Sequence, residues 1–199
     1  SVAKIDACGF MGCTGLGKVT LPESVKHIGH DAFSACQKMS EINIPANVDS
    51  IGDHAFKDAH ALKQITMSDS VKYLGEQAFA YCQNLTSAKI SENITEIRFK
   101  TFAGCTKLTD FTLSPNITII ADSAFQGVKC FDTLKLSNLN SVGDYAFADC
   151  GKLKYVYMPE KLRKIGNYTF KGDSIEQYYV EWTSAPAIKS GYFTYCDTL

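Results

Sequence analysis

The sequence has little net charge and no long apolar segment. Its formal net charge is −1 over 199 residues, so it creates no field that would gather nucleic acid or anionic lipid. No apolar run approaches the roughly 20 residues that a membrane-spanning helix needs. The chain also lacks a C-x-x-C pair, a G-x-G-x-x-G motif and a phosphate loop, which leaves common zinc, dinucleotide and phosphate sites unsupported. We therefore expect no nucleic-acid partner, no membrane insertion, no cofactor and no metal.

Phenylalanine, in contrast, recurs through the chain at an almost constant interval. Seven of the eight steps between successive members of the series are 23 residues long, and one is 22. A fixed short period in a large apolar side chain indicates one structural unit stacked on copies of itself. The sequence therefore predicts a solenoid, in which each coil buries its apolar face against its neighbours. The series is Phe10, Phe33, Phe56, Phe79, Phe102, Phe125, Phe147, Phe170 and Phe193.

Other positions of the repeat carry equally consistent residue types. Each coil is counted from its first aliphatic residue, so that coil one begins at Ile5 and coil two at Ile28. Gly often follows this aliphatic, as at Gly75, which suits a close approach between neighbouring coils. Later in the coil, apolar and polar residues alternate, as around Ile42 and Ile44. This period of two indicates a strand with one buried face.

Cysteine also occupies one position of the repeat. Ala59 and Val128 stand at that position in two coils, and because neither can pair, we interpret it as a place for a small buried hydrophobe with free thiols. Cys8 and Cys130 lie elsewhere in their coils, and the spacing leaves open whether either forms a disulfide. The cysteines at the shared position are Cys13, Cys36, Cys82, Cys105, Cys150 and Cys196.

Each coil is predicted to contain a strand, a turn, a short second strand and one or two helical turns. The helix-tolerant stretch, for example residues 53–59, is too short to form an independent helix. Equivalent strands should stack in parallel, about 4.8 Å apart. About eight coils would then form a rod roughly 40 Å long.

The repeat resembles the BspA-like leucine-rich repeat, with the approximate pattern L-x-x-I-x-I-P-x-x-V-x-x-I-G-x-x-A-F-x-x-C. Residues 39–56, MSEINIPANVDSIGDHAF, follow this pattern closely, and the similarity covers nearly the whole chain. The resemblance implies a right-handed leucine-rich-repeat solenoid, mostly β with short helical turns. It also implies secreted or surface-anchored proteins of host-associated bacteria and some protozoan parasites, with roles in adhesion. It provides no catalytic motif to carry over.

The pattern is least regular in coil eight, over residues 171–187. Asp173 stands at the cysteine position, and the run from Tyr178 to Trp182 replaces the usual strand sequence. The repeat pattern resumes at Ile188. We expect residues 1–199 to form a single array whose two ends both lie inside repeats, and the native protein to continue at least beyond Leu199, because stable solenoids need caps.

Histidine and acidic residues offer one candidate for chemistry. His30-Asp31 and Asp53-His54 lie in equivalent turns of adjacent coils, so they could approach one another. A solvated turn is the favoured interpretation over a metal site, because neither pair is repeated. Nothing in the chain resembles a nucleophile elbow, so no catalytic residue is assigned.

The outward residues of the main strands form the natural binding surface. Most outward pairs are polar and mixed, but those of coils seven and eight are rich in aromatic residues. Tyr and Trp are enriched at interaction hot spots, although they could equally cover an irregular coil. The candidate partner-binding residues are Tyr155, Tyr157, Gln177, Tyr179 and Trp182.

A solenoid mainly supplies an extended surface, which favours a non-enzymatic interaction module. We expect a monomeric secreted or cell-surface protein that binds a protein or glycan, such as a host matrix component, through its exposed strand face. The alternative is a structural spacer that presents another domain at the cell surface. A hydrolase is disfavoured, because no paired carboxylates or activated nucleophile are recognisable.

Overall fold

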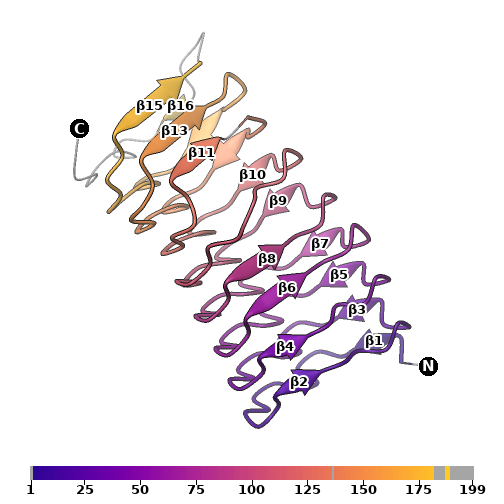
Figure 1. Cartoon of the computed structure of the whole chain (residues 1–199). Coiled ribbons are helices and arrows are strands. Elements are labelled where there is room, and N and C mark those ends of the chain that lie inside the picture. Colours follow the sequence, from indigo (N-terminus) through magenta and orange to yellow (C-terminus); the bar gives the residue numbers. More distant parts are fainter. Residues whose placement is uncertain (1, 136, 182–186, 189–199) are drawn as a thin grey trace.

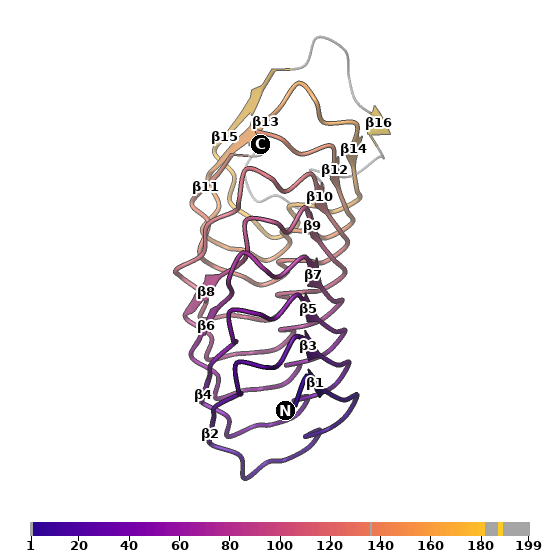
Figure 2. The same cartoon turned by 90° about the vertical axis from the view of Figure 1, so that its right-hand side faces the viewer.

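The chain forms a stack of β-coils in which equivalent strands of successive coils lie side by side (Figure 1). The computed structural model describes residues 2–135, 137–181 and 187–188. About eight turns follow one another with a spacing near 23 residues, so the predicted parallel β-solenoid is confirmed. Figure 2 shows the strands in two rows, on opposite sides of the stack.

The first row contains the short strands at the start of each coil. They pair in parallel, in the orders β1-β3-β5-β7 and β16-β14-β12-β10-β9. In the register, Ile5 lies beside Ile28, which lies beside Ile51. The strands are β1 (Lys4–Ile5), β3 (His27–Ile28), β5 (Ser50–Ile51), β7 (Tyr73–Leu74), β9 (Glu96–Ile97), β10 (Ile119–Ile120), β12 (Ser141–Val142), β14 (Lys164–Ile165) and β16 (Ala187–Ile188).

The second row contains the strands that the alternating pattern predicted. It is divided into the pairs β2-β4 and β6-β8 and the three-stranded sheet β11-β13-β15. Along β13, Val156 and Met158 are buried, whereas Tyr155 and Tyr157 between them are only partly buried. The strands are β2 (Lys18–Val19), β4 (Glu41–Ile42), β6 (Gln64–Thr66), β8 (Ser87–Lys89), β11 (Thr133–Lys135), β13 (Tyr155–Met158) and β15 (Gln177–Val180).

Stacked phenylalanine rings run through the centre of the solenoid. From Phe10 to Phe170, successive rings of the series lie 5.1 to 6.0 Å apart between centroids, with interplanar angles of 1° to 12°. The rings from Phe33 to Phe170 are fully buried, and Phe10 at the end of the stack is 40% exposed. Phe193 lies outside the described residues. Each ring is thus the repeated apolar contact between one coil and the next.

The cysteine position lies beside this stack. Cys36, Cys82, Cys105 and Cys150 are buried free thiols, and the thiol of Cys105 donates a hydrogen bond to the Phe79 carbonyl at 3.1 Å. Burial raises the pKa of the Cys105 thiol to about 12. Cys13 is exposed, and Cys196 lies outside the described residues. All cysteines in the described part of the chain, Cys8 and Cys130 included, are free.

The stretches expected to form helical turns are consecutive tight turns, and the described residues contain no helix. Asp31 and Ala35 have left-handed φ angles of 53° and 57°, which a right-handed helix cannot accommodate. The Phe33 N–H donates to the Ala55 carbonyl of the next coil at 2.8 Å. These amides therefore hold neighbouring coils together instead of closing helical turns.

The glycine after the first aliphatic allows the coils to approach closely. A Cβ atom at Gly75 would lie 2.4 Å from the backbone nitrogen of Asp53, and one at Gly166 would lie 2.3 Å from that of Asp144. Real Cβ atoms do not approach backbone this closely, so only glycine fits at these positions.

The second row is interrupted at coil five, which the sequence did not predict. Residues 111–113 form no strand, and the coil keeps only an isolated parallel bridge between Ser87 and Asp110. The gap between β8 and β11 is visible in Figure 1. Phe111 replaces a smaller aliphatic, and its ring lies edge-on against Phe102 and Phe125, at 5.2 and 5.3 Å between centroids. The bulk of this ring is the physical reason we assign for the lost strand pairing.

Candidate functional site

Three outward side chains line up across the sheet β11-β13-β15. Lys135 pairs in register with Tyr157, and Tyr157 pairs with Tyr179. Because the side-chain period of a strand is two, equal register places all three on the same face. We call Lys135, Tyr157 and Tyr179 the aromatic row.

The aromatic row is held together by ring contacts. The rings of Tyr157 and Tyr179 stack with centroids 4.2 Å apart and an interplanar angle of 5°. The Lys135 ammonium lies 5.5 Å from the centroid of the Tyr157 ring, within cation–π range. Tyr179 is nevertheless 40% exposed. The row therefore presents ordered aromatic surface to solvent at the edge of the described sheet.

The parallel row of outward residues consists of Thr133, Tyr155 and Gln177. The Tyr155 hydroxyl donates to a Glu176 carboxylate oxygen at 3.1 Å, and Lys154 pairs with the same carboxylate at 2.5 Å. These two contacts lower the pKa of Glu176, and the hydrogen bond to Glu176 raises the pKa of Tyr155. The network holds the phenol of Tyr155 in β13 against the residue that precedes β15.

Gln177 links the aromatic row to the neighbouring line of outward side chains that contains Tyr155. Its side-chain oxygen accepts a hydrogen bond from the Tyr179 hydroxyl at 2.5 Å. Partial desolvation is the main cause that raises the pKa of Tyr179, with a smaller contribution from its interaction with Tyr157. Tyr155, Tyr157, Gln177 and Tyr179 are thus brought together on one face.

Trp182 lies outside the described residues. Glu176 was not recognised from the sequence, and Lys135 was recognised only as an outward strand residue and not as a candidate partner-binding residue, although both contact a candidate tyrosine. The signal for Lys135 was present in the sequence, since it occupies the same outward position in coil six as Tyr157 does in coil seven. Glu176 precedes the strand and could be found only from the geometry.

Coil eight follows the stack more regularly than its sequence indicated. Residues 177–180 form β15, which pairs with four residues of β13. The departure is instead at Asp173, whose side chain is fully buried. One carboxylate oxygen accepts from the Gly151 N–H at 2.7 Å, and the other has no hydrogen-bond partner in the described part of the chain. Burial raises the pKa of this carboxyl to about 7.

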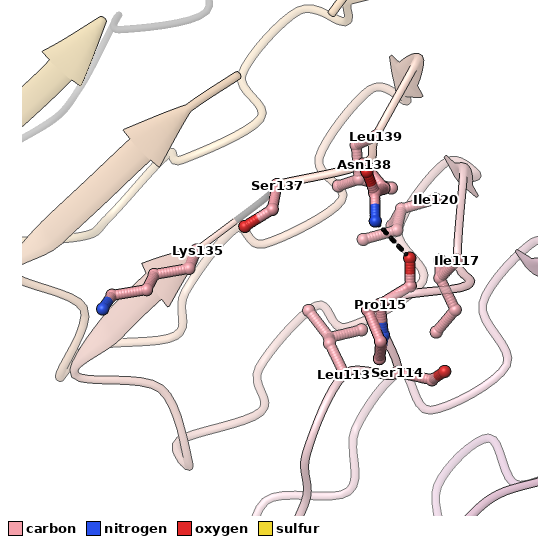
Figure 3. Close-up of a pocket in the computed structure, with 9 residues that line it drawn as sticks. All are labelled: Leu113, Ser114, Pro115, Ile117, Ile120, Lys135, Ser137, Asn138 and Leu139. Atoms are coloured by element: carbon pink, nitrogen blue, oxygen red, sulfur yellow. Dashed lines mark hydrogen bonds between the residues drawn. The ribbon is translucent and has the colours of Figure 1, made fainter. Parts of the chain in front are cut away.

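Three hollows include Lys135 of the aromatic row in their lining, and two of them bear on recognition. A cleft of about 270 Å³ is lined by Lys135, Tyr157 and Glu181 among others. A second cavity, of about 200 Å³, lies between coils five and six, beside the interrupted strand row (Figure 3). There the Asn138 amide donates to the Pro115 carbonyl at 2.8 Å. Lys135 lines both of these hollows, whose other lining residues come from coils five to eight.

The side chains on this surface suit recognition. Phenol rings provide rigid apolar area with a polar tip, and Lys135 adds a cation beside them.

Separately, the described residues contain no helix long and apolar enough to cross a bilayer.

Comparison with known proteins agrees with this architecture. The family described as BspA type leucine rich repeat region matches in six copies, over residues 1–105 and 74–199. A leucine-rich repeat protein of T. pallidum is similar in structure, with 27% identity and a TM-score of 0.61 over 86% of this chain and 70% of that one.

A leucine rich cell surface protein from Faecalibacterium prausnitzii A2-165 is 24% identical, with a TM-score of 0.53. This match covers 93% of the present chain and 52% of the other. A comparison with curated proteins gave no match. The family match extends over the whole repeat array, and the chain is therefore a member of the BspA-type leucine-rich repeat family.

Proposed function

We propose that this chain is a non-enzymatic interaction module that binds a protein or glycan partner through the face of β11, β13 and β15. The observation that carries the proposal is the stacking of Tyr157 on Tyr179, 4.2 Å apart, on a face where Tyr179 stays 40% exposed. Tyrosine is enriched at binding hot spots, so a stacked pair that stays exposed favours a binding role.

The fixed geometry of the surface supports the same proposal. The Tyr155 phenol is held by Glu176, and the Tyr179 phenol by Gln177. A side chain that is already ordered loses little conformational entropy on binding. The adjoining cleft of about 270 Å³ would accept a side chain or a sugar ring beside the stacked pair.

Membership of a leucine-rich-repeat family supports a binding module in general. A location outside the cell or on its surface, an adhesive role and a monomeric state are further parts of the proposal. They would be tested by fractionation of the producing cells and by sedimentation of the purified chain.

The binding test uses a panel of immobilised extracellular-matrix proteins and mucin glycans. Wild-type protein is compared with Tyr157→Ala/Tyr179→Ala and with the control Tyr73→Ala. Tyr73 is a suitable control because it is 39% exposed and lies on β7, in the other strand row. We expect at least one ligand that the wild type and the control bind and the double variant does not.

A structural spacer is the alternative function. The outward residues of β6 and β8, Gln64, Thr66, Ser87 and Lys89, are polar and carry no aromatic cluster. Equal binding by the double variant, or no binding of the wild type across the panel, would contradict the proposal and favour the spacer.

A further inference from the structure

A cluster of metal-ligating side chains lies at the opposite end of the described stack from the aromatic row. Cys8, Asp31 and His54 occupy the same position in three successive coils, 23 residues apart. Each has a left-handed φ, between 53° and 57°, and each N–H donates to a carbonyl of the following coil at 2.8 or 2.9 Å. The shared backbone geometry therefore aligns their side chains along one edge of the solenoid.

His30 completes the cluster from the position next to Asp31. Cys8 Sγ, a ring nitrogen of His30 and a carboxylate oxygen of Asp31 all lie within 4.8 Å of one another. Cys8 and His30 are exposed, and Asp31 is half-buried. Ligand atoms around one tetrahedral Zn²⁺ lie about 3.5 Å apart, given metal–ligand distances of about 2.0 to 2.3 Å. The observed spread of up to 4.8 Å is wider than this, so the exposed Cys8 and His30 side chains would rotate toward the ion on binding.

The ligand types favour Zn²⁺ over Mg²⁺ and Ca²⁺. A thiolate, an imidazole and a carboxylate are all ligands of Zn²⁺, whereas Mg²⁺ and Ca²⁺ prefer oxygen alone. Three protein ligands leave a fourth position for water, as in open zinc sites. Because the cluster is exposed, the ion would enter without opening the core.

A second set of contacts orients the carboxylate. His54 Nδ1 lies 3.5 Å from Asp31 Oδ2, and Gln77 Nε2 lies 3.0 Å from His54 Nε2. With the Gln77 amide donating to Nε2, the imidazole proton resides on Nδ1 and faces the Asp31 carboxylate. Outer contacts of this kind fix the orientation of metal ligands. In this arrangement His54 is a positioning residue.

We propose that Cys8, His30 and Asp31 bind one Zn²⁺ ion between coils one and two. The ion would join adjacent coils through side chains that the unfolded chain does not hold together, so it stabilises the folded end of the array.

The test is a zinc titration of metal-stripped protein, kept reduced, in competition with a chromogenic chelator. We expect a single equivalent bound, and on Co²⁺ substitution a thiolate charge-transfer band. Cys8→Ala, His30→Ala and Asp31→Asn should each weaken binding at least about tenfold, and His54→Ala should weaken it by about tenfold through the carboxylate. Asn tolerates the left-handed φ at position 31, so that variant keeps the turn.

Matched controls are Cys13→Ala and His60→Ala, which remove an exposed thiol and a surface imidazole outside the cluster. Circular dichroism verifies that every variant is folded, and Zn²⁺ should raise the melting temperature of wild type and controls only. The proposal is overturned if wild-type protein takes up no Zn²⁺ against the chelator. It is equally overturned if Cys8→Ala and His30→Ala bind as tightly as wild type, or if the controls lose binding to the same degree.

Discussion

The rings of Tyr157 and Tyr179 lie parallel, 4.2 Å apart between centroids, on neighbouring strands of the second row. In-register pairing of β13 and β15 produces this contact, since directly opposite residues on one face are near neighbours. The pair is therefore a consequence of the repeat itself, with tyrosine placed at the same outward position in two successive coils.

Lys135 extends the pair into coil six, and its removal should weaken partner binding modestly. An exposed cation–π contact contributes about 0.5 to 1 kcal/mol, so Lys135→Ala should lower affinity about two- to fivefold. Lys89→Ala is the matched control, because Lys89 is an exposed outward lysine of β8. Affinity is measured by surface plasmon resonance with the panel ligand that wild type binds. If Lys135→Ala lowers the affinity no more than Lys89→Ala does, Lys135 is not part of the binding surface.

The phenylalanine stack should dominate stability. Phe79 is fully buried between Phe56 and Phe102, at 5.1 and 5.6 Å, so Phe79→Ala should cost about 3 to 5 kcal/mol of unfolding free energy. Phe10 is 40% exposed and stacks on one side only, so Phe10→Ala should cost much less. Urea unfolding followed by circular dichroism measures both. Similar losses for the two variants would contradict the continuous-stack interpretation.

The buried thiols should resist alkylation in the folded state. Burial raises the pKa of Cys105 to about 12 and that of Cys82 well above its usual range, so little reactive thiolate forms. Iodoacetamide at mildly alkaline pH should label the exposed Cys8 and Cys13 first. Peptide mapping by mass spectrometry distinguishes the sites. If Cys82 and Cys105 stay unlabelled in denaturant without reductant, they are disulfide-bonded and the free-thiol account is wrong.

Asp173 should make stability depend on pH. Burial raises its folded pKa from 3.8 to about 7, so the folded state holds the proton more tightly than the unfolded state. The protonated carboxyl is the form that the folded state favours. The stability that depends on this proton is therefore fully present below pH 3.8 and is lost as the pH rises to about 7.

Asp173→Asn cannot ionise and should remove this dependence. Relative to wild type, the variant should be stabilised by up to a few kcal/mol above neutral pH, with the difference shrinking in acid. Melting temperatures across this range measure it, and Asp132→Asn is the control for an exposed carboxylate that does not act on Asp173. A constant difference between wild type and Asp173→Asn at every pH would show that the carboxyl does not titrate with folding.

The periodicity predicted the architecture because each repeat position has one physical environment. Phe33 to Phe170 are equivalent in contact as well as in spacing, and the outward position of Tyr179 followed from that of Tyr157. The interruption at Phe111 was not predictable, because its alternating pattern is that of a strand and only the packed ring reveals the lack of room. The expected helical turns were wrong because amides such as that of Phe33 bond the next coil.

The site was predictable in part for similar reasons. The tyrosines were visible as outward aromatics, whereas Glu176 precedes its strand and has no repeat signal. The proximity of Cys8 to Asp31 could have been found from the period, since the two are 23 residues apart. To recognise these two residues as part of a metal-ligating cluster, the position of the His30 ring was needed as well.

The most direct test of the binding surface is the affinity of the panel ligand for Tyr179→Ala, with wild type and Tyr73→Ala measured alongside. Truncation of a hot-spot aromatic costs about 2 kcal/mol or more, which corresponds to a loss of about 30-fold. The account predicts this loss for Tyr179→Ala and wild-type affinity for Tyr73→Ala. Equal affinities for all three proteins would contradict it.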